Sequence, residues 1–399
     1  MKRKILIAIL VLIILSQIPF VYRRSRLRRL HNTIQQLATQ RVFSFDATEY
    51  VDYKGVIHVH SFLGGHSTGS FSELIAAANA NQLDFVIMTE HPQAEFDTSI
   101  MTLNGSHAGV LFINGSEVAT ASGDRLLIIP GASNAATMNT QSTQQIIDQQ
   151  KASGGLAFAA YPDESLNWQS TKVDGVEIYN LFTNARTINR FVTFFDGLWS
   201  YRAYPDLMFA KFFARPADNL SRWDQAIANT NRKLVAIAGN DAHSNVGVSL
   251  NDSSGNQLLG IKLDPYERSF RTVRTHVLIK QGEGLTRESL IEALSLGHCY
   301  ISFDLFSDAS GFNFSVANSD KTMGDEVALR TQPRVIVRTT LPSRVVLIKN
   351  GSAVEQKSGT EVEFSPDGAG AYRVEIYLDS LPAPVTAQPW ILSNPIYVR

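Results

Sequence analysis

Histidine and acidic residues suited to metal binding lie in three parts of this sequence. The largest group consists of His58, His60, His66 and His91. A second group pairs Asp241 with His243, and Glu117 lies between the two groups. Imidazole and carboxylate ligands suit divalent ions such as Zn²⁺, Mn²⁺ or Fe²⁺. The only cysteine, Cys299, excludes a thiolate-rich site and an internal disulfide, so imidazoles and carboxylates must hold any metal ion.

These ligands would support hydrolysis by a metal-bound hydroxide. Two divalent ions roughly 3.5 to 4 Å apart can share a bridging hydroxide that is a nucleophile at neutral pH, while both ions polarise the substrate oxygen. Glu117 is the expected bridging carboxylate. Such a centre hydrolyses phosphate esters and, with different pocket walls, carboxyl esters, amides or carbamates.

The elements around the first histidine group are expected to form a strand, a helix and a second strand. Residues 56–60 form a β-branched run, and alternate residues of an extended strand point to the same side, so His58 and His60 should emerge together. Ser70 and Glu73 form a capping box that opens a helix to about Leu83. Residues 84–89 return as a parallel strand, and parallel α/β folds carry their chemistry at the carboxyl ends of strands.

The same alternation continues along the chain. Further strands are expected at 110–114, 126–130, 155–160, 175–179 and 234–238, and helices at 142–153 and 285–299, with an aromatic helical region at 188–223. Beyond about residue 311, alternating apolar runs separated by turn residues predict an antiparallel β-sandwich. Asn350-Gly351 is a strong hairpin signal there.

Three short blocks, HVHS, TEH and AGNDAH, occur in this order after apolar strands. Together they resemble the signature blocks of the PHP (polymerase and histidinol phosphatase) superfamily of metal-dependent hydrolases, over roughly residues 55–300. Residues 389–398 are also similar to the tail of the branch related to carbaryl hydrolase. The resemblance implies a distorted β/α barrel of about seven strands, a (β/α)7 barrel, with two or three metal ions.

The resemblance also implies how the metal ligands are divided. One metal ion would be held by His58, His60, Glu117 and Asp241. The other would be held by His66, His91 and His243. The remaining histidines, among them His276, have no partner block and are expected to be structural.

Four positions depart from the family pattern. Glu90 replaces the usual aspartate and Asn240 the usual serine or threonine, while Tyr161 and Asp124 stand where family members often have metal-binding histidines. These last two departures argue against a third metal ion, so two ions are expected.

The expected catalytic residues are Asp241, Glu90 and Tyr161. Glu90 is expected to orient His91, because a metal-bound imidazole usually needs a hydrogen-bond partner on its other nitrogen. Tyr161 would donate a hydrogen bond to the developing oxyanion or simply pack. Arg186 and Arg215 are candidates for holding an anionic substrate.

The amino terminus carries a membrane signal. Residues 5–21 are apolar, three basic residues precede them and five arginines follow them. No small-residue cleavage signature follows, which favours an uncleaved transmembrane helix. The arginine distribution favours a cytoplasmic body, whereas the charged fraction of 18% and the wealth of Ser, Thr, Asn and Gln favour an extracytoplasmic one, which is the orientation we expect.

The sequence therefore predicts an α/β membrane-anchored hydrolase with an appended β-sandwich. The expected domains are the anchor at 1–29, a linker at 30–50, the barrel at 51–310 and the sandwich at 311–399. A small anionic ester, first of all a phosphate ester, is the expected substrate, and the net charge of −1 gives no reason to expect nucleic acid. A non-catalytic barrel that binds a ligand or carbohydrate is the alternative from another class.

Overall fold

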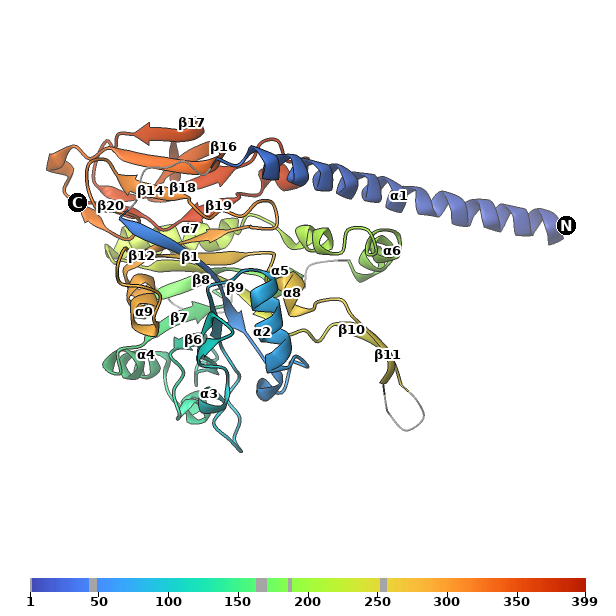
Figure 1. The fold of residues 1–399 in the computed structure, drawn as a ribbon, viewed down its shortest axis with the longest axis horizontal. Helices are drawn as coiled ribbons and strands as arrows, with labels where there is room; N and C mark the ends of the chain where they lie inside the picture. The colour runs from blue at the N-terminus through green and yellow to red at the C-terminus, as the bar shows by residue number, and fades with distance from the viewer. Residues whose placement is uncertain (1, 43–48, 163–170, 186–188, 252–256) are drawn as a thin grey trace.

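The structure is a computed structural model that describes residues 2–42, 49–162, 171–185, 189–251 and 257–399. It is a mixed α/β protein with a large sheet and a long amino-terminal helix (Figure 1). This confirms the predicted α/β class and the predicted apolar helix. The finer prediction of a seven-stranded PHP-type barrel stays a prediction.

The first strand, β1 (Tyr50–Val59), lies at the centre of the parallel part of the sheet. It pairs in parallel with β2 (Phe85–Met88) on one side and with β9 (Val235–Ala242) on the other. The parallel pairing continues from β2 to β4 (Val110–Ile113), and from β9 through β8 (Gly175–Asn180) to β7 (Leu156–Ala160). The carboxyl ends of β1, β2 and β9 consequently meet at one edge.

Two neighbouring strands break the parallel pattern. β6 (Arg125–Ile129) runs antiparallel to both β5 (Ser116–Ala119) and β7. The connection from β5 to β6 is a tight turn closed by the amide of Thr120 on the carbonyl of Asp124. A parallel pair needs a crossover of a dozen or more residues, so this short connection permits only a hairpin. An isolated parallel bridge joins Glu90, just beyond β2, to Ser116.

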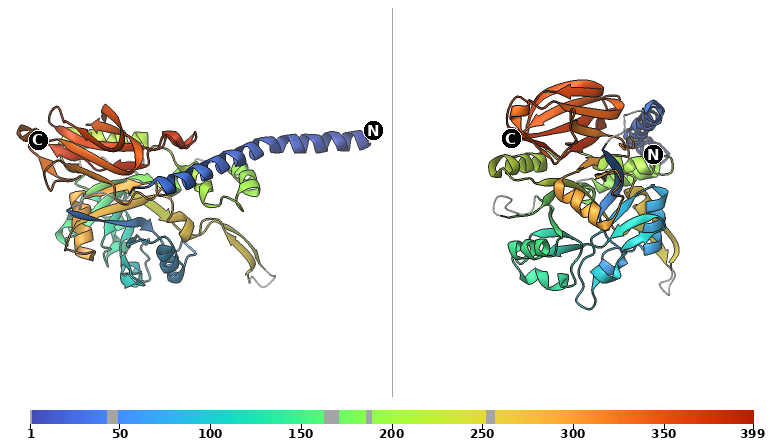
Figure 2. Two further views of the ribbon diagram at one scale, coloured as in Figure 1. Left: turned by 45° about the horizontal axis from the view of Figure 1, so that its top comes forward. Right: turned by 60° about the vertical axis from the view of Figure 1, so that its left-hand side comes forward.

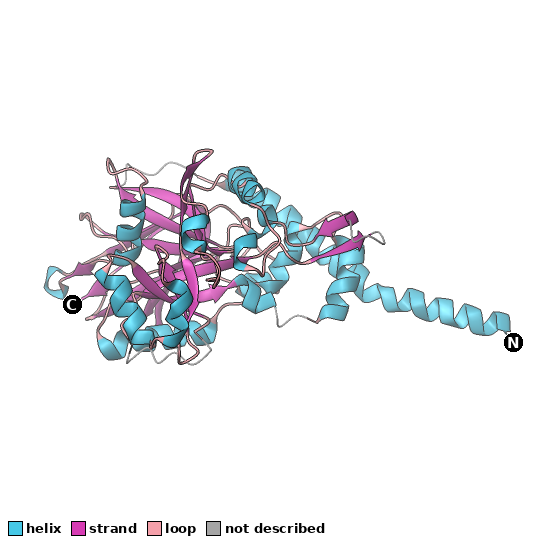
Figure 3. Ribbon diagram, turned by 90° about the horizontal axis from the view of Figure 1, so that it is seen from below, coloured by secondary structure: helices cyan, strands magenta, loops and turns pink. Residues whose placement is uncertain are grey.

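Helices pack on the outside of the strands (Figure 3). The predicted capping box of Ser70 and Glu73 is present and opens α2 (Phe71–Ala80). α4 (Thr143–Ala152) packs on β7, and α7 (Ala217–Thr230) packs on β8. α9 (Arg287–Leu296) packs on β12 (Arg274–Lys280), and it ends where Gly297 adopts a left-handed conformation with a φ of 78°.

Short elements fill the connections. The helical ones are η1 (Phe62–Gly64), α3 (Thr98–Met101), η2 (Ala135–Thr140), α5 (Leu181–Ala185), η3 (Asp206–Phe212), α8 (Tyr266–Ser269), η4 (Leu329–Thr331) and η5 (Val385–Ala387). β3 (Gly105–His107) pairs with β4. β10 (Gly247–Asn251) and β11 (Gln257–Lys262) form a separate two-stranded sheet that extends from the body (Figure 1).

The carboxyl-terminal strands continue the hydrogen bonding of the sheet. β12 (Arg274–Lys280) is antiparallel to β1, and it leads through β13 (Cys299–Ser302) to β19 (Ile391–Ser393). The remaining strands are β14 (Asn313–Val316), β15 (Glu326–Val327), β16 (Val335–Lys349), β17 (Ser352–Phe364), β18 (Gly370–Tyr377) and β20 (Ile396–Val398). Asn350 and Gly351 form the expected turn between β16 and β17, with φ values of 48° and 87°.

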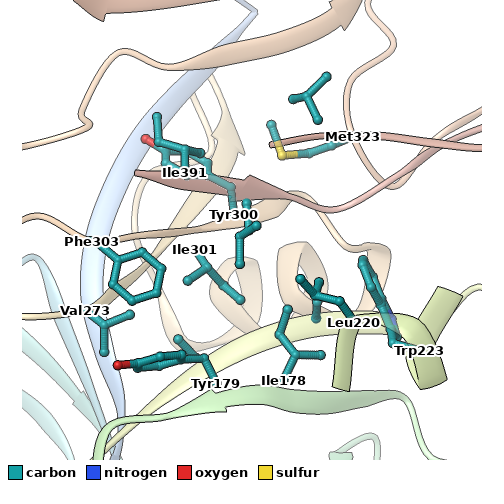
Figure 4. Packing of buried hydrophobic residues seen from close by; sticks show 14 of the residues in the cluster. Ile178, Tyr179, Leu220, Trp223, Val273, Tyr300, Ile301, Phe303, Met323 and Ile391 are labelled. Atoms are coloured by element: carbon teal, nitrogen blue, oxygen red, sulfur yellow. The ribbon is translucent and has the colours of Figure 1, made fainter. Parts of the chain in front are cut away.

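The apolar core crosses from the α/β region into these strands. Ile178 of β8 and Trp223 of α7 belong to the same buried cluster as Ile301 of β13 and Ile391 of β19 (Figure 4). Burial of such side chains contributes about 1.5–3 kcal/mol each. The strands beyond residue 311 are therefore joined to the α/β region both by hydrogen bonds and by a shared core.

The amino-terminal helix α1 (Lys2–Gln40) projects from the body (Figure 2). Its apolar window has a mean hydropathy of 2.7 and is 0% buried, so the helix could anchor to a membrane or be a signal sequence. Its last turns pack on the body, where Leu30 and Leu37 are each 4% exposed. α1 thus continues as one helix across the boundary expected at residue 29.

Candidate metal centre

His58 and His60 lie at the carboxyl end of β1, but not through the simple alternation expected from the sequence. The pairing of β1 with β2 and β9 shifts register between Ile57 and Val59, and His58 has a positive φ of 67°. Backbone strain of this kind is held only where the surrounding structure over-determines it. Both imidazoles are fully buried, and their ring centroids lie 5.1 Å apart.

The other predicted histidines surround His60. Its imidazole lies nearly parallel to those of His91 and His243, at centroid distances of 4.5 and 4.4 Å, and these two rings are 6.4 Å apart. His66, in the loop after η1, contacts His91 edge-on at 5.0 Å. His60, His91 and His243 follow or end β1, β2 and β9, so the three neighbouring parallel strands bring them together as predicted.

Two carboxylates reach the same imidazoles. Oε2 of Glu117 lies 3.1 Å from Nε2 of His58, 3.4 Å from Nε2 of His60 and 3.6 Å from Nε2 of His91. Oδ1 of Asp241 lies 3.5 and 3.4 Å from Nε2 of His58 and His60. Glu117 therefore touches histidines of both expected ligand sets, as a bridging carboxylate must.

The donor atoms of this cluster fit a metal ion. Neither ring nitrogen of His60 nor Oδ1 of Asp241 has a hydrogen-bond partner among the described residues, although all three atoms are buried. Buried polar atoms rarely stay unpaired without a functional reason. Within this cluster, two trios have ligand atoms within 4.8 Å of one another: His60 with His91 and His243, and His58 with His60 and Asp241. These are ligand types that Zn²⁺, Mn²⁺ and Fe²⁺ accept.

Glu177 is a site residue that the sequence reasoning missed. Its Oε1 lies 2.5 Å from Nδ1 of His58, on the side of the ring away from Glu117. Asn180 donates from Nδ2 to Oε2 of Glu177 and to Oδ2 of Asp241. A carboxylate on the far nitrogen of an imidazole fixes its tautomer and raises its basicity as a ligand. The available signal was a glutamate inside the otherwise apolar run of β8.

Four residues of the cluster are held in the protonation states that a metal ion needs. Burial lowers the pKa of His91 to about 3 and that of His60 to about 4. Although burial opposes it, the imidazole of His58 lowers the pKa of Glu117 to about 2. His58 and His60 likewise lower the pKa of Asp241, against the effect of burial. His60 and His91 are therefore neutral, and Glu117 and Asp241 ionised, at neutral pH.

His58 differs from the other histidines because three carboxylates surround it. Although burial opposes it, Glu177 and Asp241 raise the pKa of His58 well above its usual range. The surroundings of His58 thus favour a positive charge at this point, which suits a cation.

Glu90 and Tyr161 make other contacts than those predicted for them. Glu90 is buried but does not reach the ring of His91: its carboxylate accepts hydrogen bonds from Ser61 and Thr102. It therefore holds the loop after β1, and the expectation that it orients His91 is corrected. Tyr161 does line the site, but its hydroxyl donates to Oδ2 of Asp241 at 2.8 Å. Its proton is thus engaged with Asp241 rather than directed at a substrate.

Of the two arginines predicted to bind the substrate, the one that the structure describes lies outside the site. Arg215 makes a bidentate contact with Glu375 of β18, at 2.8 and 2.6 Å, and this carboxylate occupies its guanidinium away from the histidines. Arg186 lies outside the described residues. Arg125 of β6 was missed, yet it lies 3.3 Å from Glu117 and lines the same cavity. Its place follows from the β5–β6 hairpin, which the sequence reasoning did not predict.

A cavity of about 650 Å³ opens onto the cluster. His66, His91, Glu117, Asp241 and His243 line it together with Tyr161. Its other walls include Phe182 of α5, Asn139 of η2 and Asn245. This size is typical of pockets for small molecules. Asp124 is not in this lining, because hydroxyls of Ser122 and Thr143 hold it at the start of α4.

The sequence matches no family model and no curated protein. Among solved structures, the chain is similar to PsfC from Pseudomonas syringae PB-5123, with a TM-score of 0.41 and 12% identity over 63% of this chain and 92% of that one. It is also similar to the lesion-specific endonuclease PfuEndoQ from Pyrococcus furiosus, with a TM-score of 0.36 and 12% identity over 61% of this chain and 56% of that one. Both scores are low, so neither similarity assigns the chain to a family.

Proposed function

We propose that this protein is a metal-dependent hydrolase of the PHP type that acts on a small anionic ester. The observation that carries the proposal is the set of buried, unpaired donor atoms on His60 and Asp241, surrounded by further imidazoles and carboxylates at the wall of a cavity. Structural clusters of polar groups satisfy one another, whereas metal sites keep donor atoms directed at a common point.

Two divalent ions, Zn²⁺, Mn²⁺ or Fe²⁺, are the proposed cofactors. His58, His60, Glu117 and Asp241 would hold one ion, and His66, His91 and His243 the other. Bound divalent ions supply a hydroxide at neutral pH and polarise the oxygen of the substrate. The Nδ1–H of His243 donates to the carbonyl of Asp241 at 2.9 Å, which leaves Nε2 as its ligand atom.

The chain itself supplies positioning and charge. Glu177 fixes the ring of His58, and Tyr161 holds Oδ2 of Asp241 so that Oδ1 remains the ligand atom. Arg125 places a permanent positive charge on the cavity wall, beside Glu117. A guanidinium there would bind an anionic group of the substrate by charge-assisted hydrogen bonds.

Phosphate esters are the preferred substrate class because Arg125 and the proposed cations together favour a substrate that remains anionic. Carboxyl esters, amides and carbamates are neutral at the scissile group and would gain less from Arg125. The overall charge of −1 supports a small molecule rather than nucleic acid.

α1 is proposed as an uncleaved membrane anchor. Leu30 and Leu37 belong to the main apolar core, and the guanidinium of Arg23 binds Asp196 of α6 (Arg190–Ser200) at 2.8 Å. Cleavage after the apolar run would place Arg23 and Leu30 near a new, untethered amino terminus and so weaken these contacts. The extracytoplasmic orientation remains part of this proposal, and protease accessibility on intact cells tests it.

Metal analysis and a substrate panel test the proposal together. The full chain, purified in detergent, should contain stoichiometric divalent metal, lose it to a chelator and regain activity with Mn²⁺ or Zn²⁺. Turnover of nitrophenyl phosphate or bis-nitrophenyl phosphate, but not of nitrophenyl acetate, would support phosphoester hydrolysis, and the reverse preference would support a carboxyl esterase. Absence of stoichiometric metal from the purified chain would contradict the proposed hydrolase activity and favour the non-catalytic, ligand-binding alternative.

A further inference from the structure

Helix α6 (Arg190–Ser200) exposes its apolar face and buries a charged residue, which is unusual for a helix in contact with water. Its large apolar side chains face outward: Phe191 is 68% exposed, Phe194 62% and Leu198 68%. With 3.6 residues per turn, these three positions fall within roughly 60° of the helix circumference. Asp196 lies on the opposite side and is only 1% exposed. A helix on a soluble surface has the reverse arrangement, with its apolar stripe against the core.

Polar contacts of the buried side fix this orientation. The carboxylate of Asp196 accepts hydrogen bonds from Nε of Arg23 at 2.9 Å and also binds the ammonium of Lys211. Turning α6 to bury its aromatic face would expose Asp196 and break its contacts with Arg23 and Lys211. The outward apolar face is therefore held in place by the rest of the fold.

The exposed face of α6 continues the apolar surface of α1. Phe195 packs against Phe20 of α1 at a centroid distance of 5.1 Å, and Phe191 and Phe194 pack on Phe195 in turn. Figures 1 and 2 show α6 beside α1, on the side of the body from which α1 extends. The two helices together make one apolar surface at the base of the projecting segment.

The position of α6 along α1 corresponds to the edge of a bilayer. At 1.5 Å per residue, the apolar run of residues 5–21 spans about 25 Å, close to the thickness of the hydrocarbon layer. Phe20 lies at the end of this run, so Phe195 sits at the depth where hydrocarbon meets headgroups.

The polar atoms nearby suit the same depth. The indole nitrogen of Trp199 donates to Gln17 at 3.0 Å, and the guanidinium of Arg24 binds the carbonyl of Trp199. Tryptophan and arginine concentrate at the interface because each combines an apolar body with a polar end.

We propose that α6 lies in the headgroup boundary of the membrane, with Phe191, Phe194 and Leu198 inserted among the acyl chains. It forms a second membrane contact beside α1 and prevents the body from pivoting freely on a single helix. The partner is the lipid bilayer itself. The inference depends on α1 as an anchor but not on the proposed hydrolase activity.

A fluorophore at position 194 tests this contact in the full chain. Phe194→Cys is labelled with an environment-sensitive nitrobenzoxadiazole dye and reconstituted into vesicles of phosphatidylcholine and phosphatidylglycerol. The native Cys299 is buried, and burial raises the pKa of its thiol to about 12, so it should not react. We expect blue-shifted emission, loss of quenching by aqueous iodide, and quenching by lipids that carry a shallow spin label.

Val354→Cys is the matched control, because Val354 is a 48% exposed apolar residue of β17, a strand at the end of the body opposite to the projecting part of α1 (Figure 1). Its label should remain accessible to iodide in the same vesicles. Phe191→Cys repeats the test at the other end of the apolar face, in case the first variant folds poorly. Iodide quenching at positions 191 and 194 equal to that at 354 would overturn the proposal. Disulfide cross-links formed by an added oxidant between unlabelled Phe194→Cys chains, together with an absence of lipid quenching in the labelled protein, would overturn it in favour of a second copy of the chain.

Discussion

The imidazole of His58 lies between two glutamates, with its Nδ1 only 2.5 Å from Oε1 of Glu177 and its Nε2 3.1 Å from Glu117. One carboxylate therefore orients the ring from behind while the other meets its ligand atom. Glu177 is fully buried and does not line the cavity, so it acts on the site through His58 and through Asn180, which also binds Asp241.

Replacing Glu177 should weaken metal binding without removing a ligand. Loss of such a hydrogen-bond partner typically lowers metal affinity or activity about 10- to 100-fold. Glu177→Gln should therefore release metal to a competing chelator at correspondingly lower concentrations than the wild type. Glu73→Gln is the control, because Glu73 is an exposed helix-capping residue. Unchanged metal affinity in the Glu177 variant would remove it from the positioning role.

Gly239 provides an independent test of the same contact. A Cβ at this position would lie 1.5 Å from Oε1 of Glu177, so Gly239→Ala must displace the carboxylate from His58. The variant should lose metal affinity to a similar extent as Glu177→Gln. In a Glu177→Ala background, Gly239→Ala should lower metal affinity much less, because the side-chain atoms of Glu177 that the new Cβ would meet are absent.

The control for this cycle is Gly197→Ala, since an added Cβ at Gly197 meets no atom within 4 Å. It should leave metal affinity unchanged. Equal losses from Gly239→Ala in both backgrounds would show that the glycine acts through something other than Glu177.

Asp241 is the residue whose loss should be most damaging to activity. Asp241→Asn removes a ligand charge next to His58 and His60 but keeps the shape and the contact with Tyr161. Removing one essential group of an active site commonly lowers turnover by about 10³-fold or more. Metal content by mass spectrometry and turnover on the best ester should fall together, while the circular dichroism spectrum is retained. A variant with normal turnover would exclude this residue from the mechanism.

Replacing Arg125 should weaken substrate binding, whereas replacing Arg215 should lower the stability of the fold. Arg125→Gln should raise KM for an anionic ester by about tenfold, the worth of one charge-assisted contact, with a smaller effect on a neutral ester. Arg215→Gln should leave KM unchanged and lower the free energy of unfolding by about 1–2 kcal/mol through its lost contact with Glu375. The opposite outcome, a KM effect only at Arg215, would restore the sequence-based assignment.

The local features of this fold could be predicted because their signals are local. Ser70 and Glu73, and the Asn350-Gly351 turn, each determine their own backbone through contacts within a few residues. The gathering of His60, His91 and His243 was also predictable, because parallel strands end at a common edge.

The features that were missed depend on distant partners. Whether Arg215 faces a substrate or Glu375 depends on a strand far along the chain, which no short pattern encodes. Glu177 was not predicted as a site residue because it lies within an apolar strand. Arg125 was not predicted because the sequence did not indicate the β5–β6 hairpin that brings it to Glu117. The strained backbone at His58 likewise results from the bulge between β1 and its two neighbours rather than from the residue types.

The buried His276, which is paired with Asp52 and Asp304, should make stability depend on pH in the alkaline range. His276 has Nδ1 2.9 Å from Asp52 and Nε2 3.4 Å from Asp304, while Tyr300 stacks on its ring. Although burial opposes it, Asp52 and Asp304 raise the pKa of His276 to about 10.

Because the folded protein binds this proton more tightly than the unfolded chain, whose histidine pKa is about 6.5, the stabilisation is complete below about pH 6.5. It declines as the pH rises and is lost above the folded pKa of about 10. His276→Gln leaves the buried carboxylate of Asp304 and the partly buried one of Asp52 without this partner and should cost roughly 3 kcal/mol at pH 6. Urea unfolding of both proteins at pH 6, 8 and 10 should show the difference shrinking as the pH rises. His107→Gln, which alters a histidine outside this network, should follow the wild type at every pH. A difference that stayed constant or grew with pH would mean that His276 is neutral in the folded protein and stabilises it by packing alone.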